Sequence, residues 1–362
     1  MDDSRKLRIG VIGCGVGGLH LEGLATNPRV DVVAVAGLDE DRCRMLATKY
    51  AIPKVYRDYH DLIVDPEIDA VTVAVPNILH APVAMDALKA GKHVMVEKPL
   101  ARTSKEAEEI IQAAKQANRV LGVVFNRRGR QDVQLLKREV ERGSLGSIYH
   151  ARAYWMRRSG IPGLGTWFTS KELAGGGPLI DLGVHVLDMA MWVLGNPTPL
   201  RVSAATYAEL GPQGRGQWQG GRFKADPGAS YDVEDFATAF IRFDGGLTLH
   251  LNASWAAYTG HGDDFGLSLM GDRGGAQINA KDYAETGTLR FFGEIDGVPT
   301  VTEPQLLKRH GHGEVLTMFI DSVLDGTPMS PSGEEGLSRV RLIEAIYRSA
   351  ELGREISLET GE

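Results

Sequence analysis

The chain has few cysteines and no long apolar run, and each shortage excludes a class of protein. Its two cysteines, Cys14 and Cys43, fit no metal-ligand spacing and indicate no disulfide framework. No apolar run approaches the roughly 18 to 20 residues that span a bilayer. The opening residues MDDSRK lead into a strand without the core of a signal peptide. We therefore expect a soluble protein of the reducing cytoplasm, with no membrane partner.

The chain also lacks an excess of positive charge. Its formal net charge of -7 argues against nucleic acid as the main partner. Apolar residues make up 43% of the 362 residues and charged residues 24%, the balance of a globular protein that is long enough for two domains. Glycine is abundant, with 44 residues, and this predicts many tight turns and close backbone approaches.

The first 125 residues predict a parallel sheet with helices on both faces, because short apolar strands alternate with helices there. Strands are expected at 7–12, 30–36, 70–75, 93–96 and 120–125, and helices at 20–26, 40–50, 80–90 and 104–118. Ser104 is the candidate N-cap of the last of these helices.

The later pattern predicts an α+β region built on a mostly antiparallel sheet. After a helix at 131–142, strands are expected at 148–155, 202–207, 235–243, 247–256, 265–270 and 288–292, and helices at 314–324 and 334–352 close the chain. The run Asp244-Gly245-Gly246 between two strands predicts a hairpin turn.

A glycine pattern follows the first strand and opens the first helix. Gly13, Gly15 and Gly18 fit G-x-G-x-x-G, and Val16 and Gly17 lie inside it. In this context the glycines let the backbone approach a dinucleotide pyrophosphate, whose charge the helix N-terminus stabilises.

The end of the second strand bears on the choice of cofactor. Gly37 stands where an acid usually reads the adenosine ribose, and Asp39 follows two residues later. A carboxylate there would repel a 2′-phosphate and so favours NAD, whereas the nearby Arg42 keeps NADP open.

The segment 175–195, GGGPLIDLGVHVLDMAMWVLG, places two ionisable residues on an otherwise apolar helix. Asp181 and His185 are four apart and so share a helix face. Buried polar groups cost free energy unless they are paired, so a proton-transfer pair explains them better than folding alone. The simpler alternative is a helix-capping acid beside a core histidine. Gly183 between them would allow a close approach to substrate or nicotinamide.

Two loops at the carboxyl ends of parallel strands could complete a site, because such sheets bind ligands at that edge. Glu97-Lys98-Pro99 follows the fourth strand, and its lysine could stabilise an oxyanion. Pro76-Asn77-Ile78-Leu79-His80 follows the third strand and could line the nicotinamide ribose.

Together these motifs resemble the Gfo/Idh/MocA family of NAD(P)-dependent oxidoreductases. The match continues through Asn126-Arg127-Arg128, Val233-Glu234-Asp235 and the closing Ser349-Ala350-Glu351-x-Gly353. The resemblance implies a Rossmann domain, placed at 1–125, and a substrate-binding and oligomerisation domain with a large open sheet, placed at 126–362. In this arrangement the C-terminal helix of the chain could pack back on the first domain.

The resemblance also implies the roles of particular residues. Lys98, Asp181 and His185 map to the catalytic lysine, aspartate and histidine of the family's dehydrogenases. For the cofactor we add Pro76, Asn77, His80, Glu97, Lys98, Asn126 and Trp167, and for the substrate Arg127, Arg158 and Trp167. Some relatives carry arginine where this chain has Phe168, which cannot make the same polar contact with the cofactor.

Weaker candidates lie in the loops of the second region. Trp218 could stack on a sugar ring or reach a neighbouring subunit, and Tyr258 and His261 could line the pocket. His310-Gly311-His312 has no third ligand at metal spacing, so no metal site is predicted, although His312 could line the substrate pocket.

The predicted function is hydride transfer between NAD(H) and a secondary ring hydroxyl of a sugar or glycoside, with a lean to C3 of a glucoside. The alternatives are an inositol dehydrogenase, an NAD-dependent glycosidase of the same fold, and a non-catalytic sugar sensor. We expect a homodimer or homotetramer, because an open sheet face of this size usually needs cover.

Overall fold

The computed structural model describes residues 6–218, 231–307 and 311–358. The chain forms two compact units, one of residues 1–129 and 310–340 and the other of residues 130–309 and 341–362. This division differs from the predicted one, because residues 126–129 and 310–340 belong to the first unit. No helix among the described residues is long and apolar enough to cross a membrane.

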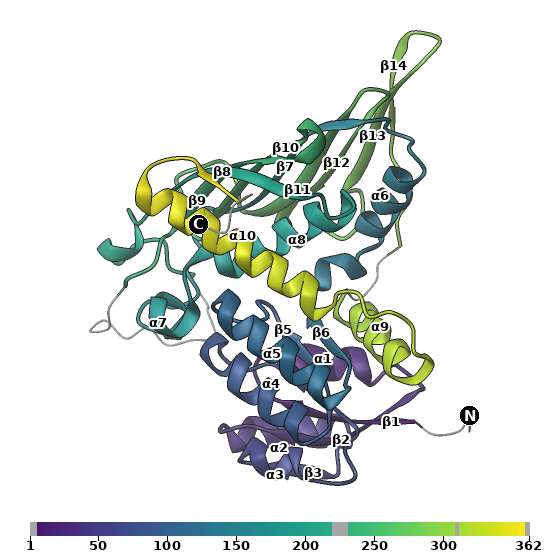
Figure 1. Cartoon of the computed structure of the whole chain (residues 1–362), viewed down its shortest axis with the longest axis vertical. Helices are drawn as coiled ribbons and strands as arrows, with labels where there is room; N and C mark the ends of the chain where they lie inside the picture. Colours follow the sequence, from purple (N-terminus) through teal and green to yellow (C-terminus); the bar gives the residue numbers. More distant parts are fainter. Residues whose placement is uncertain (1–5, 219–230, 308–310, 359–362) are drawn as a thin grey trace. The chain divides into compact units, whose positions relative to one another are not determined.

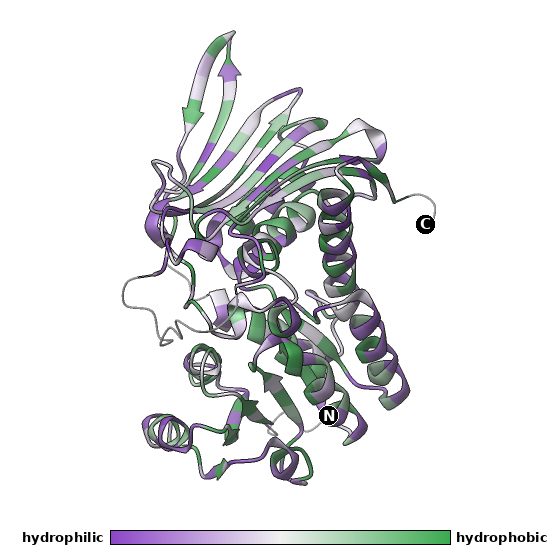
Figure 2. Cartoon of the chain, turned by 90° about the vertical axis from the view of Figure 1, so that its left-hand side faces the viewer, coloured by the Kyte–Doolittle hydropathy of each residue, from purple (hydrophilic) through white to green (hydrophobic). Residues whose placement is uncertain are grey.

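The first unit contains a six-stranded parallel sheet of strand order β3-β2-β1-β4-β5-β6 (Figure 1). Its strands are β1 (Leu7–Ile12), β2 (Val30–Ala36), β3 (Lys54–Tyr56), β4 (Ala70–Val73), β5 (His93–Glu97) and β6 (Leu121–Val124). Every residue of β4 and β6 is buried, as expected for parallel strands covered on both faces, and the sheet is coloured mostly as hydrophobic in Figure 2.

The helices of this unit are α1 (Gly17–Leu24), α2 (Glu40–Lys49), α3 (Tyr59–Ile63), α4 (His80–Lys89), α5 (Ser104–Ala117) and α9 (Gly311–Asp325). The N-cap of α5 is Thr103, whose hydroxyl accepts from the backbone N–H of Glu106, so the prediction of Ser104 as the cap is wrong by one residue. The elements β3 and α3 are too short for a periodic pattern and were not predicted.

The helix α9 returns the chain to the first unit and packs against α1. Asn27 Nδ2 donates to Thr317 Oγ1 at 3.2 Å, and Val315 and Phe319 join the buried core of the unit. The contact is close, since a Cβ at Gly23 would lie 2.8 Å from Gly313 Cα. The sequence pattern allowed the C-terminal helix to pack back on this domain, but it did not single out α9.

The second unit contains a nine-stranded sheet of order β14-β13-β12-β11-β7-β10-β9-β8-β15. Its strands are β7 (Ile148–Arg157), β8 (Pro199–Tyr207), β9 (Phe236–Phe243), β10 (Thr248–Ser254), β11 (Asp263–Gly271), β12 (Gly275–Ala280), β13 (Leu289–Ile295), β14 (Val298–Thr302) and β15 (Ile356–Ser357). Among the described strands of this sheet, β7 and β10 alone pair in parallel, and the hairpin predicted at residues 244–246 joins β9 to β10. The predicted mostly antiparallel sheet is therefore confirmed.

One face of this sheet is covered by helices. The unit contains α6 (Gln131–Glu141), α7 (Lys171–Ala174) and α8 (Val184–Val193), while α10 (Gly333–Leu352) begins in the first unit and ends in the second. Along β10 buried Leu249 and Leu251 alternate with half-buried His250, which points to the other face. The strands in Figure 2 show the same alternation of polar and apolar residues.

The contact between α1 and α9 can be tested at two glycines of the same helix. Gly23→Ala should lower the free energy of unfolding by about 1–3 kcal/mol, because its Cβ meets backbone atoms of α9. Gly18→Ala should be neutral or stabilising by up to about 1 kcal/mol, because its Cβ would lie 3.8 Å from the nearest atom, Leu46 Cδ2, and alanine is the better helix former. Urea unfolding of the cofactor-free protein measures both variants. Equal effects would contradict the packing.

Candidate functional site

The glycine loop between β1 and α1 has the shape that a bound pyrophosphate needs. Gly13 has a φ of 101°, and a Cβ there would lie 2.2 Å from the carbonyl oxygen of Ala74, so only glycine fits. A Cβ at Gly15 would have no atom within 4 Å, which leaves space beside the backbone. The helix α1 begins at Gly17 after the N-cap Val16 and directs its first N–H groups to this loop. The loop therefore fits the phosphates of a dinucleotide.

A disulfide joins the glycine loop to α2 and corrects the expectation that the two cysteines are unpaired. Cys14 and Cys43 are both buried, and their Cα atoms lie 5.7 Å apart. A Cβ at Gly37 would lie 2.9 Å from the sulfur of Cys43 and 3.1 Å from that of Cys14. The two sulfur atoms fill the space that a side chain at position 37 would need. The disulfide therefore explains why glycine stands there in place of the usual acid.

Asp39 and Arg42 lie beside this loop. Asp39 is exposed and caps α2 by accepting from the backbone N–H of Arg42 at 3.1 Å. The Arg42 side chain donates through Nε to the carbonyl of Cys14, and its Nη2 lies 3.4 Å from the carbonyl oxygen of Gly15. Arg42 therefore supports the loop, whereas the Asp39 carboxylate stays open to a ribose.

Glu97, at the end of β5, is the centre of a buried cluster in the first unit. Its Oε1 lies 2.8 Å from His20 Nε2 and 3.7 Å from His312 Nε2, and its Oε2 accepts from the backbone N–H of Lys98 at 3.1 Å. Burial alone would raise the pKa of Glu97, but the hydrogen bond from His20 and the nearby His312 hold it well below the usual value. The carboxylate thus fixes the backbone of half-buried Lys98, and its predicted contact with the cofactor stays a prediction.

His80 connects the two loops at the carboxyl edge of the sheet. Its Nδ1 lies 2.7 Å from the carbonyl oxygen of Pro99, and its Nε2 lies 2.9 Å from that of Val75. Burial lowers the pKa of His80. Because both ring nitrogens face backbone oxygens, His80 holds the loop of Pro76 and Asn77 against the lysine loop. Its predicted contact with the cofactor stays a prediction.

Asp181 and His185 lie where a helix changes its winding. Residues Leu179–Gly183 form a π-helical turn that continues into α8, whereas the sequence predicted a regular helix. Such turns occur frequently at functional sites. The half-buried Asp181 carboxylate accepts from Trp255 Nε1 at 2.9 Å, and the buried His185 imidazole lies 5.5 Å from the ring of Trp155.

Gly183 lies close to the neighbouring turn and to the sheet. A Cβ there would lie 3.1 Å from Leu179 Cδ1 and 3.2 Å from Ala253 Cβ. The glycine therefore lets the turn pack against β10, and its predicted approach to substrate or nicotinamide stays a prediction.

The remaining predicted residues are divided between the two units. In the second unit the Trp167 ring stacks on Phe168 at 3.8 Å, and Phe168 meets Trp255 edge-on at 6.5 Å. Aromatic contacts thus link Trp167 to the tryptophan that binds Asp181. Phe168 uses its ring to support Trp167, where some relatives have an arginine.

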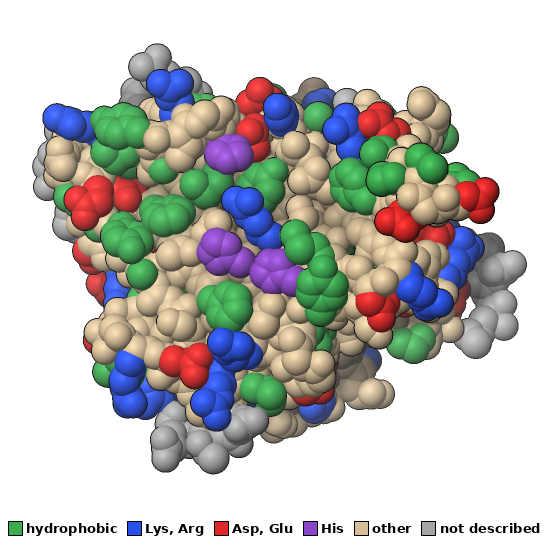
Figure 3. Space-filling model, turned by 90° about the horizontal axis from the view of Figure 1, so that it is seen from above, with side chains coloured by type: hydrophobic (Ala, Val, Ile, Leu, Met, Phe, Trp, Pro, Cys, Tyr) green, Lys and Arg blue, Asp and Glu red, His purple; other side chains and the backbone are tan. Residues whose placement is uncertain are grey.

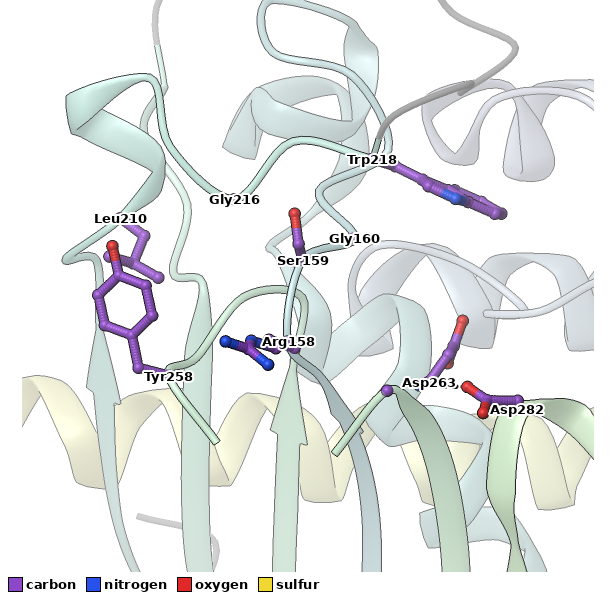
Figure 4. A pocket seen from close by; sticks show the side chains of 10 residues that line it. Arg158, Ser159, Gly160, Leu210, Gly216, Trp218, Tyr258, Asp263 and Asp282 are labelled. Atoms are coloured by element: carbon purple, nitrogen blue, oxygen red, sulfur yellow. Dashed lines mark hydrogen bonds between the residues drawn. The ribbon is translucent and has the colours of Figure 1, made fainter. Parts of the chain in front are cut away.

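In the first unit, Asn126 lies in a short helical turn, and its amide nitrogen is 3.3 Å from His312 Nε2. Arg127 is half-buried beside it. Arg158, in the second unit, is exposed and lines a pocket (Figure 4). His310 lies outside the described residues.

Comparisons with known proteins identify the family. Two family models match in succession, an oxidoreductase family with an NAD-binding Rossmann fold over residues 7–125 and a GFO/IDH/MocA C-terminal domain over residues 133–277. D-glucoside 3-dehydrogenase from Escherichia coli K12 is 34% identical, and the match covers 98% of each chain. The chain belongs to the GFO/IDH/MocA family of oxidoreductases.

Other relatives agree with this. Myo-inositol 2-dehydrogenase from Thermotoga maritima is 30% identical over 98% of this chain and 99% of the relative. A levoglucosan dehydrogenase solved with NADH and L-sorbose has a TM-score of 0.87 and 25% identity, over 98% of this chain and all of that chain. The predicted family, fold class, oxidoreductase activity and NAD as cofactor are therefore confirmed.

Sequence reasoning quoted Glu234 within a motif but gave it no role. In the structure its carboxylate is buried and accepts from the backbone N–H groups of Gly177 at 2.9 Å and Leu179 at 3.0 Å, and from the hydroxyl of Tyr347 at 2.8 Å. Burial raises the pKa of Glu234 in spite of these bonds. It therefore holds the start of the helical segment that carries Asp181 and His185. Its partners lie 55 or more residues away, so no local pattern reveals them.

Glu234→Gln tests this role, because the amide would face one backbone N–H with a donor of its own. We expect a loss of about 1–3 kcal/mol in the free energy of unfolding and a fall in kcat that exceeds any rise in KM for NAD. Urea unfolding and steady-state kinetics measure the two effects. The matched control is Glu172→Gln on the exposed surface of α7, which should change neither. Full activity of Glu234→Gln would show that the carboxylate does not position the helix.

Proposed function

We propose that the protein oxidises a secondary ring hydroxyl of a sugar or glycoside with NAD, and that C3 of a glucoside is the reacting carbon. The observation that carries this proposal is the 34% identity with D-glucoside 3-dehydrogenase along almost the whole of both chains. The acid and imidazole of Asp181 and His185 on one helical segment, and the loop that presents Lys98, are compatible with such a reaction.

The proposed mechanism assigns one task to each of these side chains. The His185 imidazole accepts the proton of the reacting hydroxyl as general base. The Lys98 ammonium group hydrogen-bonds the reacting oxygen and stabilises its developing negative charge. Asp181, oriented by Trp255, binds the neighbouring hydroxyl or sets the imidazole tautomer. NAD, when bound, supplies the nicotinamide that accepts the hydride.

An inositol dehydrogenase is the second candidate, supported by the 30% identity with the Thermotoga enzyme. Two further alternatives from the sequence make different predictions. A glycosidase of this fold would cleave a glycoside without a net build-up of NADH, and a sugar sensor would bind without turnover.

We further propose that the protein is a homodimer or homotetramer that associates through the outer face of the nine-stranded sheet. On this face apolar Phe240 lies half-exposed beside His250. Histidine, basic and apolar side chains are interspersed there (Figure 3). The mixture of apolar and polar groups suits a second copy of the same chain better than lipid.

Sedimentation analysis tests the association. Phe240→Glu would place a charge in the centre of the proposed interface and should shift the protein towards monomer. Val64→Glu, on an exposed position of the first unit, should leave the sedimentation coefficient unchanged. A native protein that sediments as a monomer would refute the proposal.

The cytoplasmic location stays a proposal. Its support is the use of NAD, which cells hold in a cytoplasmic pool, while the Cys14–Cys43 disulfide removes the argument from unpaired cysteines.

A substrate screen tests the catalytic proposal. We expect methyl glucosides to reduce NAD more efficiently than inositols, and NAD to be preferred over NADP, as read at the nicotinamide absorbance. Lys98→Ala and His185→Ala should each lower kcat by about 10² to 10⁴-fold. The exposed Lys105→Ala and His60→Ala serve as controls. Near-normal rates in both active-site variants would exclude this mechanism, and reduction by inositols alone would favour the second candidate.

A further inference from the structure

We propose that the pocket at the end of β7 binds a second sugar ring of the substrate, next to the ring that is oxidised. This proposal rests on the proposed function and specifies its substrate as a neutral disaccharide-like glycoside. The pocket has a volume of about 390 Å³ and lies wholly within the second unit. Volumes of this order suit a small ligand.

The walls of the pocket come from loops at one end of the sheet (Figure 4). Arg158 and Ser159 follow β7, Tyr258 lies between β10 and β11, and Asp282 follows β12. Trp218 lines the pocket from a separate loop, and Figure 4 draws its ring apart from the side chains of Tyr258 and Arg158.

Two aromatic side chains supply the apolar surface that a sugar ring needs. The exposed fraction is 48% for Trp218 and 77% for Tyr258, although large aromatic side chains are usually well covered. The Trp218 ring is held in place by the guanidinium of Arg157, which lies 5.4 Å from its centre. A fixed indole with an exposed face can stack on the C–H groups of a pyranose ring.

The exposed charged groups that line the pocket carry one positive and one negative charge. The Asp263 carboxylate is already bound, since it accepts from Trp155 Nε1 at 2.6 Å and from Arg157 Nε at 2.9 Å. This leaves the exposed Arg158 guanidinium as a donor and the exposed Asp282 carboxylate as an acceptor. One charge of each sign suits a neutral ring with several hydroxyl groups better than an anion.

Asp282 is held where it can accept a hydroxyl. Its Oδ1 accepts from the backbone N–H of Asp263 at 3.2 Å, and its own N–H donates to Asp264 Oδ1 at 3.2 Å. The residue has a φ of 47°, in the left-handed region, so its backbone is fixed in a conformation that few residues adopt.

The buried Trp155 side chain links this pocket to His185, because Asp263, which lines the pocket, accepts from Trp155 Nε1 at 2.6 Å. The His185 ring lies 5.5 Å from Trp155, the Arg157 guanidinium lies 5.7 Å from Trp155, and the same guanidinium lies 5.4 Å from Trp218. In this proposal one ring of the glycoside lies at His185 and the next ring lies against Trp218.

The test compares one-ring and two-ring substrates. For Trp218→Ala we expect kcat/KM to fall at least tenfold for cellobiose or maltose and no more than threefold for the matching methyl glucosides. Trp218→Phe keeps an aromatic face and should recover most of the loss. Arg158→Met and Asp282→Asn should also impair the disaccharides more than the methyl glucosides. Equal losses on both kinds of substrate would overturn the proposal.

Binding measured without turnover separates this proposal from the proposed function. Calorimetry should detect cellobiose or maltose binding to the native protein, at least tenfold weaker binding to Trp218→Ala, and intermediate binding to Trp218→Phe. Such binding with no oxidation of any glycoside would support the pocket and refute the proposed function. If methyl glucosides are oxidised and Trp218→Ala impairs disaccharides no more than methyl glucosides, the proposed function would be supported and the second-ring site would be refuted. Failure of both binding and oxidation would overturn both.

Discussion

The second unit depends on one buried carboxylate. Glu234 accepts hydrogen bonds from the backbone of Gly177 and Leu179 and from the hydroxyl of Tyr347, and so joins β9, α10 and the helical segment of Asp181 and His185. A buried charge is tolerated only when donors surround it, and truncating one partner of such a group usually costs several kcal/mol. The orientation of the proposed base therefore depends on a residue that itself carries no chemistry.

The glycines before that segment follow from the same constraint. A Cβ at Gly177 would lie 2.1 Å from the carbonyl oxygen of Glu234, and one at Gly176 would lie 2.0 Å from the hydroxyl of Tyr347. In the structure this glycine run is a tightly packed contact. These glycines allow the backbone to approach the carboxylate, and the π-helical turn then begins directly after them.

The sequence predicted features that depend on neighbouring residues, and it missed features that depend on residues far apart in the chain. The period of apolar residues and the G-x-G-x-x-G pattern are local, so the parallel strands and the cofactor loop could be predicted. The roles of His80, His312 and Glu234 depend on partners that lie 19 to 215 residues away in the chain, and such distant pairs leave no spacing to recognise. The return of α9 to the first unit was missed for the same reason, because its partner α1 lies almost 300 residues earlier in the chain.

At the adenosine end of the cofactor loop, the replacement of the usual acid by Gly37 goes together with the disulfide and with the position of Arg42. Cys43 and Arg42 are adjacent on α2, and both are tied to Cys14, one through sulfur and the other through the carbonyl oxygen. The sulfur atoms occupy the space beside Gly37, so an acid at that position would collide with them. Asp39 is then the carboxylate left to meet a ribose, and Arg42, whose Nε and Nη2 face the loop, is poorly placed to meet a phosphate. The preference for NAD therefore follows from the way this loop is packed, although the acid usual in such folds is absent.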